Sequence, residues 1–171
     1  FEIVAALAAG VGVADTCRRL RPDLLLLDLS LPDRSGLEVI ADVLGWLAPM
    51  AQERGVRLTA GVEPLTVSGD AEQLREAIGN VVANAILYNR PDGSVTVTAR
   101  ECGGVAMIEI VDTGVGIPSE AVPRVFDRFF RVHEGRGRHE GAGLGLAIVR
   151  WIVSAHGGGI GLGVLAQRPA D

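Results

Sequence analysis

Two asparagines, Asn80 and Asn84, are the first side chains in the sequence that could take part in chemistry. They lie in a segment whose apolar residues repeat with helical spacing, so a separation of four residues would place both amides on one face of a helix. Their carbonyl oxygens could face a bound Mg²⁺ ion, which prefers oxygen ligands. The same pair could instead be structural, with each amide satisfying neighbouring backbone groups. The pair alone leaves both interpretations open.

A carboxylate beside glycines forms a second candidate site. Asp112 ends an apolar segment and is followed by Gly114 and Gly116, where the missing side chains let backbone and ligand approach closely. A carboxylate at this place could accept a hydrogen bond from an exocyclic amine, such as the N6 group of adenine. The alternative is an Asp-Gly turn without a ligand.

A glycine-rich segment, Gly141-Ala-Gly143-Leu144-Gly145, precedes a predicted helix. Free backbone N–H groups at a helix start can bind phosphate oxygens. The segment is not the dinucleotide-binding fingerprint, because it follows a long basic loop and not the first strand of a βαβ unit. Four arginines in and before that loop could contact a triphosphate, although each alone could equally be a solvated surface charge: Arg128, Arg131, Arg136 and Arg138.

The elements that must position these residues alternate between helical and strand-like patterns, which predicts an α/β fold. A turn at Pro91-Asp92-Gly93 and a Gly103-Gly104 pair delimit two strands that are expected to form an antiparallel hairpin. Asp70 is expected to cap the helix that carries the two asparagines. The expected helices are 37–53 (interrupted at Gly45 and Pro49), 71–88, 120–130 and 144–156, and the expected strands are 56–60, 65–68, 94–100, 105–111 and 160–166.

Length and composition limit the possible classes of protein. A chain of 171 residues can hold one domain and a fragment of another. A net charge of −5 argues against general nucleic-acid binding. No apolar run reaches the roughly 20 residues of a membrane-spanning helix, so we expect no membrane segment in this chain and a cytoplasmic location. Cys17 and Cys102 match no metal or redox spacing and are expected to be reduced thiols, with a disulfide as the alternative.

Four motifs occur together in an order that resembles the ATP-binding catalytic domain of bacterial sensor histidine kinases. All four motifs of that family find a counterpart in the order expected. The counterparts are Asn80-Val-Val-Ala-Asn84-Ala for the N box, Asp112-Thr-Gly114-Val-Gly116 for the first glycine box, Phe126-Asp-Arg-Phe-Phe130 for the phenylalanine box and Gly141-Ala-Gly143-Leu-Gly145 for the second glycine box.

The resemblance implies a Bergerat fold over residues 41–171, which is a two-layer α/β sandwich of a mixed sheet with helices on one face. It also implies that ATP binds under a lid formed by residues 131–141. By resemblance, Asp112 binds the adenine amine, Tyr88 lines the base pocket, and Asn84 and Asn80 hold Mg²⁺. Arg131 reaches the terminal phosphate. The remaining nucleotide-binding residues implied are Gly114, Gly116, Gly141, Gly143, Leu144 and Gly145.

The implied activity is transfer of the ATP γ-phosphate to a histidine. Related gyrase-like ATPases carry a water-activating Glu where this chain has Asn80, so an amide here favours phosphoryl transfer over hydrolysis. The implied partners are a histidine-bearing dimerisation hairpin, absent from this chain, and a cognate response regulator; the parent kinase could be membrane-anchored. His133, His139 and His156 do not fit the phosphorylated position.

One departure from the family pattern favours an alternative function. Leu87 stands where the family usually has Lys or Arg, so phosphate affinity would be lower unless Arg90 compensates. A non-catalytic nucleotide-binding or interaction module is therefore the alternative to a kinase.

Residues 1–40 resemble part of a response-regulator receiver domain, which has a flavodoxin-like fold. Asp28 falls at the phosphoacceptor position, with Pro32 and Gly36 where that family places them. A carboxylate attacks a phosphoryl group only when Mg²⁺ and a cation offset its charge. The family's acidic pair and its later strands are missing, so Asp28 is expected to be inert.

Overall fold

The computed structural model describes residues 36–64, 69–102, 105–132 and 142–163. The receiver-like resemblance of residues 1–40, including Asp28, therefore lies almost wholly outside the described residues. Gly141, Arg136, Arg138, His133 and His139 lie outside them as well, and so does the expected strand 65–68. In the described part, Cys102 is an exposed free thiol.

The described strands form one mixed sheet in the order β1-β2-β3. They are β1 (Arg57–Val62), β2 (Ser94–Cys102) and β3 (Val105–Asp112). β1 runs parallel to β2, and β2 pairs antiparallel with β3 in a register that places Val95 opposite Asp112. The predicted hairpin and the predicted mixed sheet are therefore confirmed.

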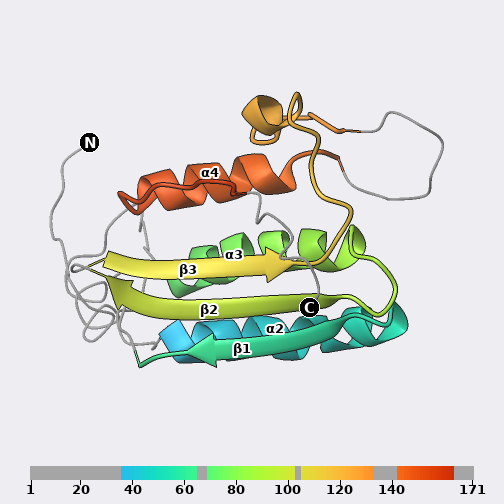
Figure 1. Cartoon of the computed structure of the whole chain (residues 1–171). Coiled ribbons are helices and arrows are strands. Elements are labelled where there is room, and N and C mark those ends of the chain that lie inside the picture. Colours follow the sequence, from blue (N-terminus) through green and yellow to red (C-terminus); the bar gives the residue numbers. More distant parts are fainter. Residues whose placement is uncertain (1–35, 65–68, 103–104, 133–141, 164–171) are drawn as a thin grey trace, which may run out of the picture.

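Helices α2 (Gly36–Glu53) and α3 (Ala71–Leu87) pack on one face of this sheet, and α4 (Gly145–Ala155) packs against α3 (Figure 1). Alternate residues of β2 point at the helices, so Val95 and Val97 are fully buried in the main core with Val43 and Val82. A second, smaller cluster joins α3 to α4 through Ala77, Val149 and Ile152.

Helix α2 is continuous, so the expected interruption at Gly45 and Pro49 is wrong. Both residues lie on the exposed side of the helix. The opposite side buries apolar residues at helical spacing, and this packing outweighs the low helix propensity of Gly and Pro. The buried positions are Gly36, Val39, Ile40, Val43, Leu47 and Ala51. Val39 and Ile40 thus belong to the main core, on the N-terminal side of the expected domain boundary at residue 41.

Two other expected elements differ in the structure. The expected helix 120–130 is only the three-residue 3₁₀ helix η1 (Val122–Arg124). Pro118 and Pro123 have no N–H group to donate, and Phe129 has a positive φ of 64°, which no α-helix allows. Residues 160–163 are not a strand, in keeping with the two glycines, Gly161 and Gly163, in this stretch; residues 164–166 lie outside the described part.

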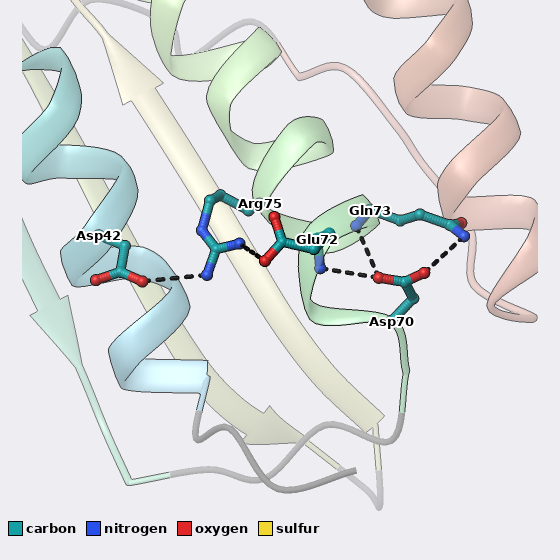
Figure 2. Close-up of polar contacts among 5 residues, drawn as sticks. All are labelled: Asp42, Asp70, Glu72, Gln73 and Arg75. Atoms are coloured by element: carbon teal, nitrogen blue, oxygen red, sulfur yellow. Dashed lines mark hydrogen bonds and ion pairs between the residues drawn. The ribbon is translucent and has the colours of Figure 1, made fainter. Parts of the chain in front are cut away.

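Asp70 caps α3 as predicted (Figure 2). Its Oδ1 accepts from the N–H groups of Glu72 at 2.8 Å and Gln73 at 3.1 Å, and its Oδ2 accepts from Gln73 Nε2 at 2.9 Å. The Asp70 N–H donates to His156 Nε2 at 3.0 Å, while His156 Nδ1 contacts Ile152 O at 2.8 Å. His156 therefore joins the start of α3 to the end of α4, which is a structural role at a helix end.

Arg75 links α3 to α2 at the surface of the helical layer (Figure 2). Its Nη2 lies 3.1 Å from Asp42 Oδ2, and its Nη1 pairs with Glu72. The hydrogen bond with Glu72 raises the pKa of the Arg75 guanidinium. Because the Asp42 side chain is 49% exposed, this ion pair is expected to add little stability.

Replacing Asp70 and replacing Asp42 provide a matched test of how much each carboxylate contributes to the free energy of unfolding. We expect Asp70→Ala to lower the free energy of unfolding by about 1–2 kcal/mol, because the first turn of α3 loses its cap. Asp42→Ala should cost less than about 0.5 kcal/mol, because it breaks an exposed ion pair. Urea unfolding followed by circular dichroism measures both values. Equal losses in the two variants would contradict the assigned cap.

Candidate functional site

Asn80 and Asn84 are both half-buried on α3. Asn80 Nδ2 donates to Glu76 O at 3.0 Å, which leaves its oxygen directed elsewhere. That oxygen lies 3.0 Å from the position that a Cβ on Gly145 would occupy, so Asn80 touches the first residue of α4. The Asn84 amide makes no hydrogen bond within the described part of the chain. Its oxygen is available to a ligand.

The turn that follows β3 packs against the end of α3. Asp112 Oδ1 accepts from the Gly114 N–H at 2.7 Å, and the Val115 N–H donates to Tyr88 O at 3.1 Å. Gly114 is required here, because a Cβ would lie 2.5 Å from Tyr88 O. One carboxylate oxygen of Asp112 thus forms a turn, while Oδ2 has no hydrogen-bond partner among the described residues. The turn and the ligand interpretations of Asp112 are compatible.

Asn89 and Thr113 fasten this turn to the sheet, and both were missed from the sequence. Thr113 Oγ1 lies 2.9 Å from the Ser94 N and 3.1 Å from Asn89 Oδ1. The only signal in the sequence is that each of them directly follows a candidate site residue, Tyr88 or Asp112.

The phenylalanine motif and the second glycine motif meet at Phe129 and Gly143. The Phe129 N–H donates to Gly143 O at 2.9 Å, and both residues have a positive φ, 64° and 69°. A Cβ on Gly143 would lie 2.9 Å from Phe129 C and from Phe130 O, so only glycine fits. The two ends of the segment 130–142 are therefore held together.

A basic hollow lies beside this junction. It has a volume of about 470 Å³ and is lined by Arg124, Asp127, Arg128, Phe129, Phe130, Arg131 and Val132. The Arg124 guanidinium lies 4.5 Å from the centre of the Phe130 ring, a cation–π contact. Arg128 and Arg131 thus line the same hollow.

The start of α4 offers backbone donors. Gly145 is the first helical residue, and the preceding Leu144 makes no capping hydrogen bond through its side chain. A helix start whose N–H groups lack a side-chain cap is suited to bind an anion.

Two contacts therefore connect motifs directly, Asn80 with Gly145 and Phe129 with Gly143. A third joins Val115 of the first glycine motif to Tyr88, three residues beyond the N-box motif. The end of α3, the end of β3 and the start of α4 lie at the same end of the domain, at the right of Figure 1. A mixed sheet with helices on one face and these loops at one end defines an α/β ATPase of the Bergerat type.

Comparison with known proteins agrees with this class. Residues 69–169 match the family of histidine kinase-, DNA gyrase B- and HSP90-like ATPases, and the chain belongs to this family. Its relatives are sensor histidine kinases, in which this domain is the catalytic kinase domain. The sensor histidine kinase CusS of Escherichia coli O157:H7 is 35% identical over 132 residues, which cover 75% of this chain and 27% of CusS. The chain thus spans about a quarter of such relatives.

Two solved structures share the fold. The mycobacterial sensor histidine kinase MprB matches with a TM-score of 0.65 and 34% identity, over 74% of this chain and 81% of the MprB chain. Full-length ShkA in complex with AMPPNP matches with a TM-score of 0.68 and 32% identity, over 88% of this chain and 31% of ShkA.

Within the described part of this chain, no helix is long and apolar enough to cross a membrane.

Proposed function

We propose that this chain binds Mg-ATP and transfers the γ-phosphate to a histidine on a helical hairpin supplied by another segment or chain. The observation that carries this proposal is the set of three contacts that brings the four motifs and Tyr88 together at one end of the domain. Around these contacts, Asp112 Oδ2 and the Asn84 amide keep hydrogen-bonding capacity for a ligand.

The base would be recognised at the turn after β3. Asp112 Oδ2 would accept from the adenine amine, and Tyr88, a residue that is 47% exposed, would line the base. Gly116 has a φ of 74° and open space where a Cβ would stand, so the backbone can approach a ligand there. ShkA, which shares this fold over 31% of its chain, was solved in complex with AMPPNP, an ATP analogue, and this supports nucleotide binding in general.

The phosphates would lie beside α3, at the start of α4. Gly143, Leu144 and Gly145 would donate backbone N–H groups, and Arg131 would reach the terminal phosphate. In the described part, no group of three or more His, Cys, Asp or Glu side chains could hold a metal ion. Asn84 and Asn80 supply neutral oxygen ligands, a set that fits Mg²⁺ when the phosphates complete its coordination. Bound Mg²⁺ would neutralise charge on the transferred group.

Transfer is favoured over hydrolysis because Asn80 is an amide. An amide cannot take a proton from an attacking water, so the chain lacks a general base at this position. The acceptor would be the partner's histidine, and a response regulator would receive the phosphoryl group next, in the cytoplasm. The receiver-like fragment proposed within residues 1–40 would be separate only before α2 begins at Gly36, because Val39 and Ile40 pack in the main core, and its Asp28 is proposed to be inert.

Leu87 supports a second candidate function. This last residue of α3 replaces the cation usual in the family, and a site with weaker phosphate contacts would suit a module that binds nucleotide without transferring phosphate. Incubation with radiolabelled ATP and a separately purified hairpin distinguishes the two functions. Label on the hairpin histidine supports the kinase; binding without label supports the module.

Calorimetric titration of ATP with and without Mg²⁺ tests the metal assignment. We expect Mg²⁺ to strengthen ATP binding in the wild type and Asn84→Ala to reduce this enhancement about tenfold, because a ligand oxygen is lost. Gln73→Ala removes an amide from the same helix at its other end and should leave the enhancement unchanged. An unchanged enhancement in Asn84→Ala would contradict the assignment.

A further inference from the structure

We propose that Asn89 and Thr113 are positioning residues that align Asp112 for recognition of the base, an inference that rests on the proposed function. Asn89 lies outside the four motifs, and Thr113 lies within the first glycine motif, where the sequence indicated no role of its own for it. Asn89 directly follows Tyr88, and Thr113 directly follows Asp112. A hydrogen bond between the two therefore joins the two parts of the proposed base pocket just behind the residues that would contact the base.

The Asn89 amide uses all of its hydrogen-bonding capacity. Its Nδ2 donates to Ala85 O at 3.0 Å and to Ser94 O at 3.1 Å. Its Oδ1 accepts from the Arg90 N–H at 2.9 Å and contacts Thr113 Oγ1 at 3.1 Å. A flipped amide would direct its oxygen at two carbonyls, so only one orientation is possible.

This orientation determines the direction of the bond from Thr113. Asn89 Oδ1 can only accept, so the Thr113 hydroxyl donates its single hydrogen to it. The hydroxyl oxygen then accepts from the Ser94 N–H at 2.9 Å, and the Thr113 N–H donates to Ser94 O at 3.1 Å. Side chain and main chain of Thr113 are thus both attached to the first residue of β2.

Although Thr113 is exposed, the pair lies close against the backbone of Gly93, which restricts its movement on that side. A Cβ on Gly93 would lie 2.1 Å from Asn89 Oδ1 and 2.7 Å from Thr113 Oγ1, so the pair fills the space of a missing side chain. On the other side of Thr113, the Gly114 N–H holds Asp112 Oδ1 at 2.7 Å. Freedom at Thr113 would therefore rotate the carboxylate whose second oxygen is to meet the adenine amine.

The test compares ATP with the purine riboside triphosphate, which lacks the 6-amino group, by calorimetric titration in Mg²⁺. We expect the wild type to prefer ATP by about tenfold to a hundredfold, as for one hydrogen bond to a charged acceptor. Thr113→Val, which keeps the shape but loses the hydroxyl, should lose most of this preference. Thr113→Ser keeps the hydroxyl and should retain the preference for ATP. Thr98→Val makes the same change in strand β2, away from the proposed site, and should also leave the preference unchanged.

A merely structural role would lower the melting temperature of Thr113→Val and leave the preference for ATP unchanged, and that result would overturn the inference. Asn89→Ala, which keeps the main-chain bond between Thr113 and Ser94, gives the same test if Thr113→Val does not fold. A wild type that binds neither nucleotide would instead contradict the proposed function, and one that binds both equally would contradict base recognition by Asp112. This inference would fail in both cases.

Discussion

Asp112→Asn is expected to weaken ATP binding about a hundredfold while leaving the fold intact, because an acceptor facing the adenine amine becomes a donor. The substitution keeps the shape of the side chain. The asparagine oxygen can still accept from the Gly114 N–H, as Oδ1 does now at 2.7 Å. The asparagine amino group then replaces Oδ2, the atom proposed to meet the base.

Calorimetric titration with both ATP and GTP makes this prediction specific. Guanine carries a carbonyl oxygen where adenine carries the amine, so an asparagine amino group would suit it better. The ratio of the two affinities should therefore shift toward GTP in Asp112→Asn. An unchanged affinity for ATP, with a melting temperature equal to that of the wild type, would show that Asp112 does not contact the base.

Gly143→Ala is expected to lower ATP affinity by about tenfold or more and to destabilise the junction of the two motifs. Two effects act together at this position. The φ of 69° costs about 1–2 kcal/mol for a residue with a Cβ, and that Cβ would lie 2.9 Å from backbone atoms of Phe129 and Phe130, which cannot move without shifting the segment. Because Gly143 directly precedes Leu144 and Gly145, the displacement reaches the proposed phosphate donors.

Gly157→Ala is the matched control, measured by the same titration and by thermal unfolding. Gly157 has a similar φ of 71°, but a Cβ there would meet no atom within 4 Å. The Gly157→Ala substitution should lower the free energy of unfolding through backbone strain alone and should leave ATP affinity unchanged. If both variants lose the same stability and neither loses affinity, the contact between Gly143 and Phe129 has no part in binding.

The sequence predicted an element correctly where its caps and its pattern of apolar residues agree with the way it packs in the fold. Asp70 before an amphipathic segment gave the start of α3, and alternation in Ser94–Cys102 gave a strand with one buried face. The continuity of α2 could not be predicted from the sequence. Pro49 favours a break in the helix, whereas burial of Val43 and Leu47 in the core, which only the fold reveals, keeps the helix continuous. Local propensity is a weak guide where tertiary contacts dominate.

Within the candidate site, residue types could be predicted but their contacts could not. Asp112, Asn80 and Asn84 stand out because their chemistry is unusual in apolar segments. The bond between Asn89 and Thr113 joins residues 24 positions apart, and no spacing rule indicates it. The left-handed Phe129 was equally hidden, because a bulky residue gives no sign of a conformation that glycine usually adopts.

The main core and the smaller cluster between α3 and α4 both include residues of α3. The domain therefore has a more stable part, built on the main core, and a less stable part, which is α4; these are called the strong and the weak part. Helix α4 is attached to α3 by the small cluster around Val149 and Ile152, whereas α2 and the sheet pack on the main core. Regions with few buried contacts open at a lower free energy than the whole protein. Helix α4 could thus separate from α3 in a local opening that leaves the sheet folded. A nucleotide that contacts both Asn80 and the start of α4 would connect the two helices, so binding and closure of the weak part would be thermodynamically coupled.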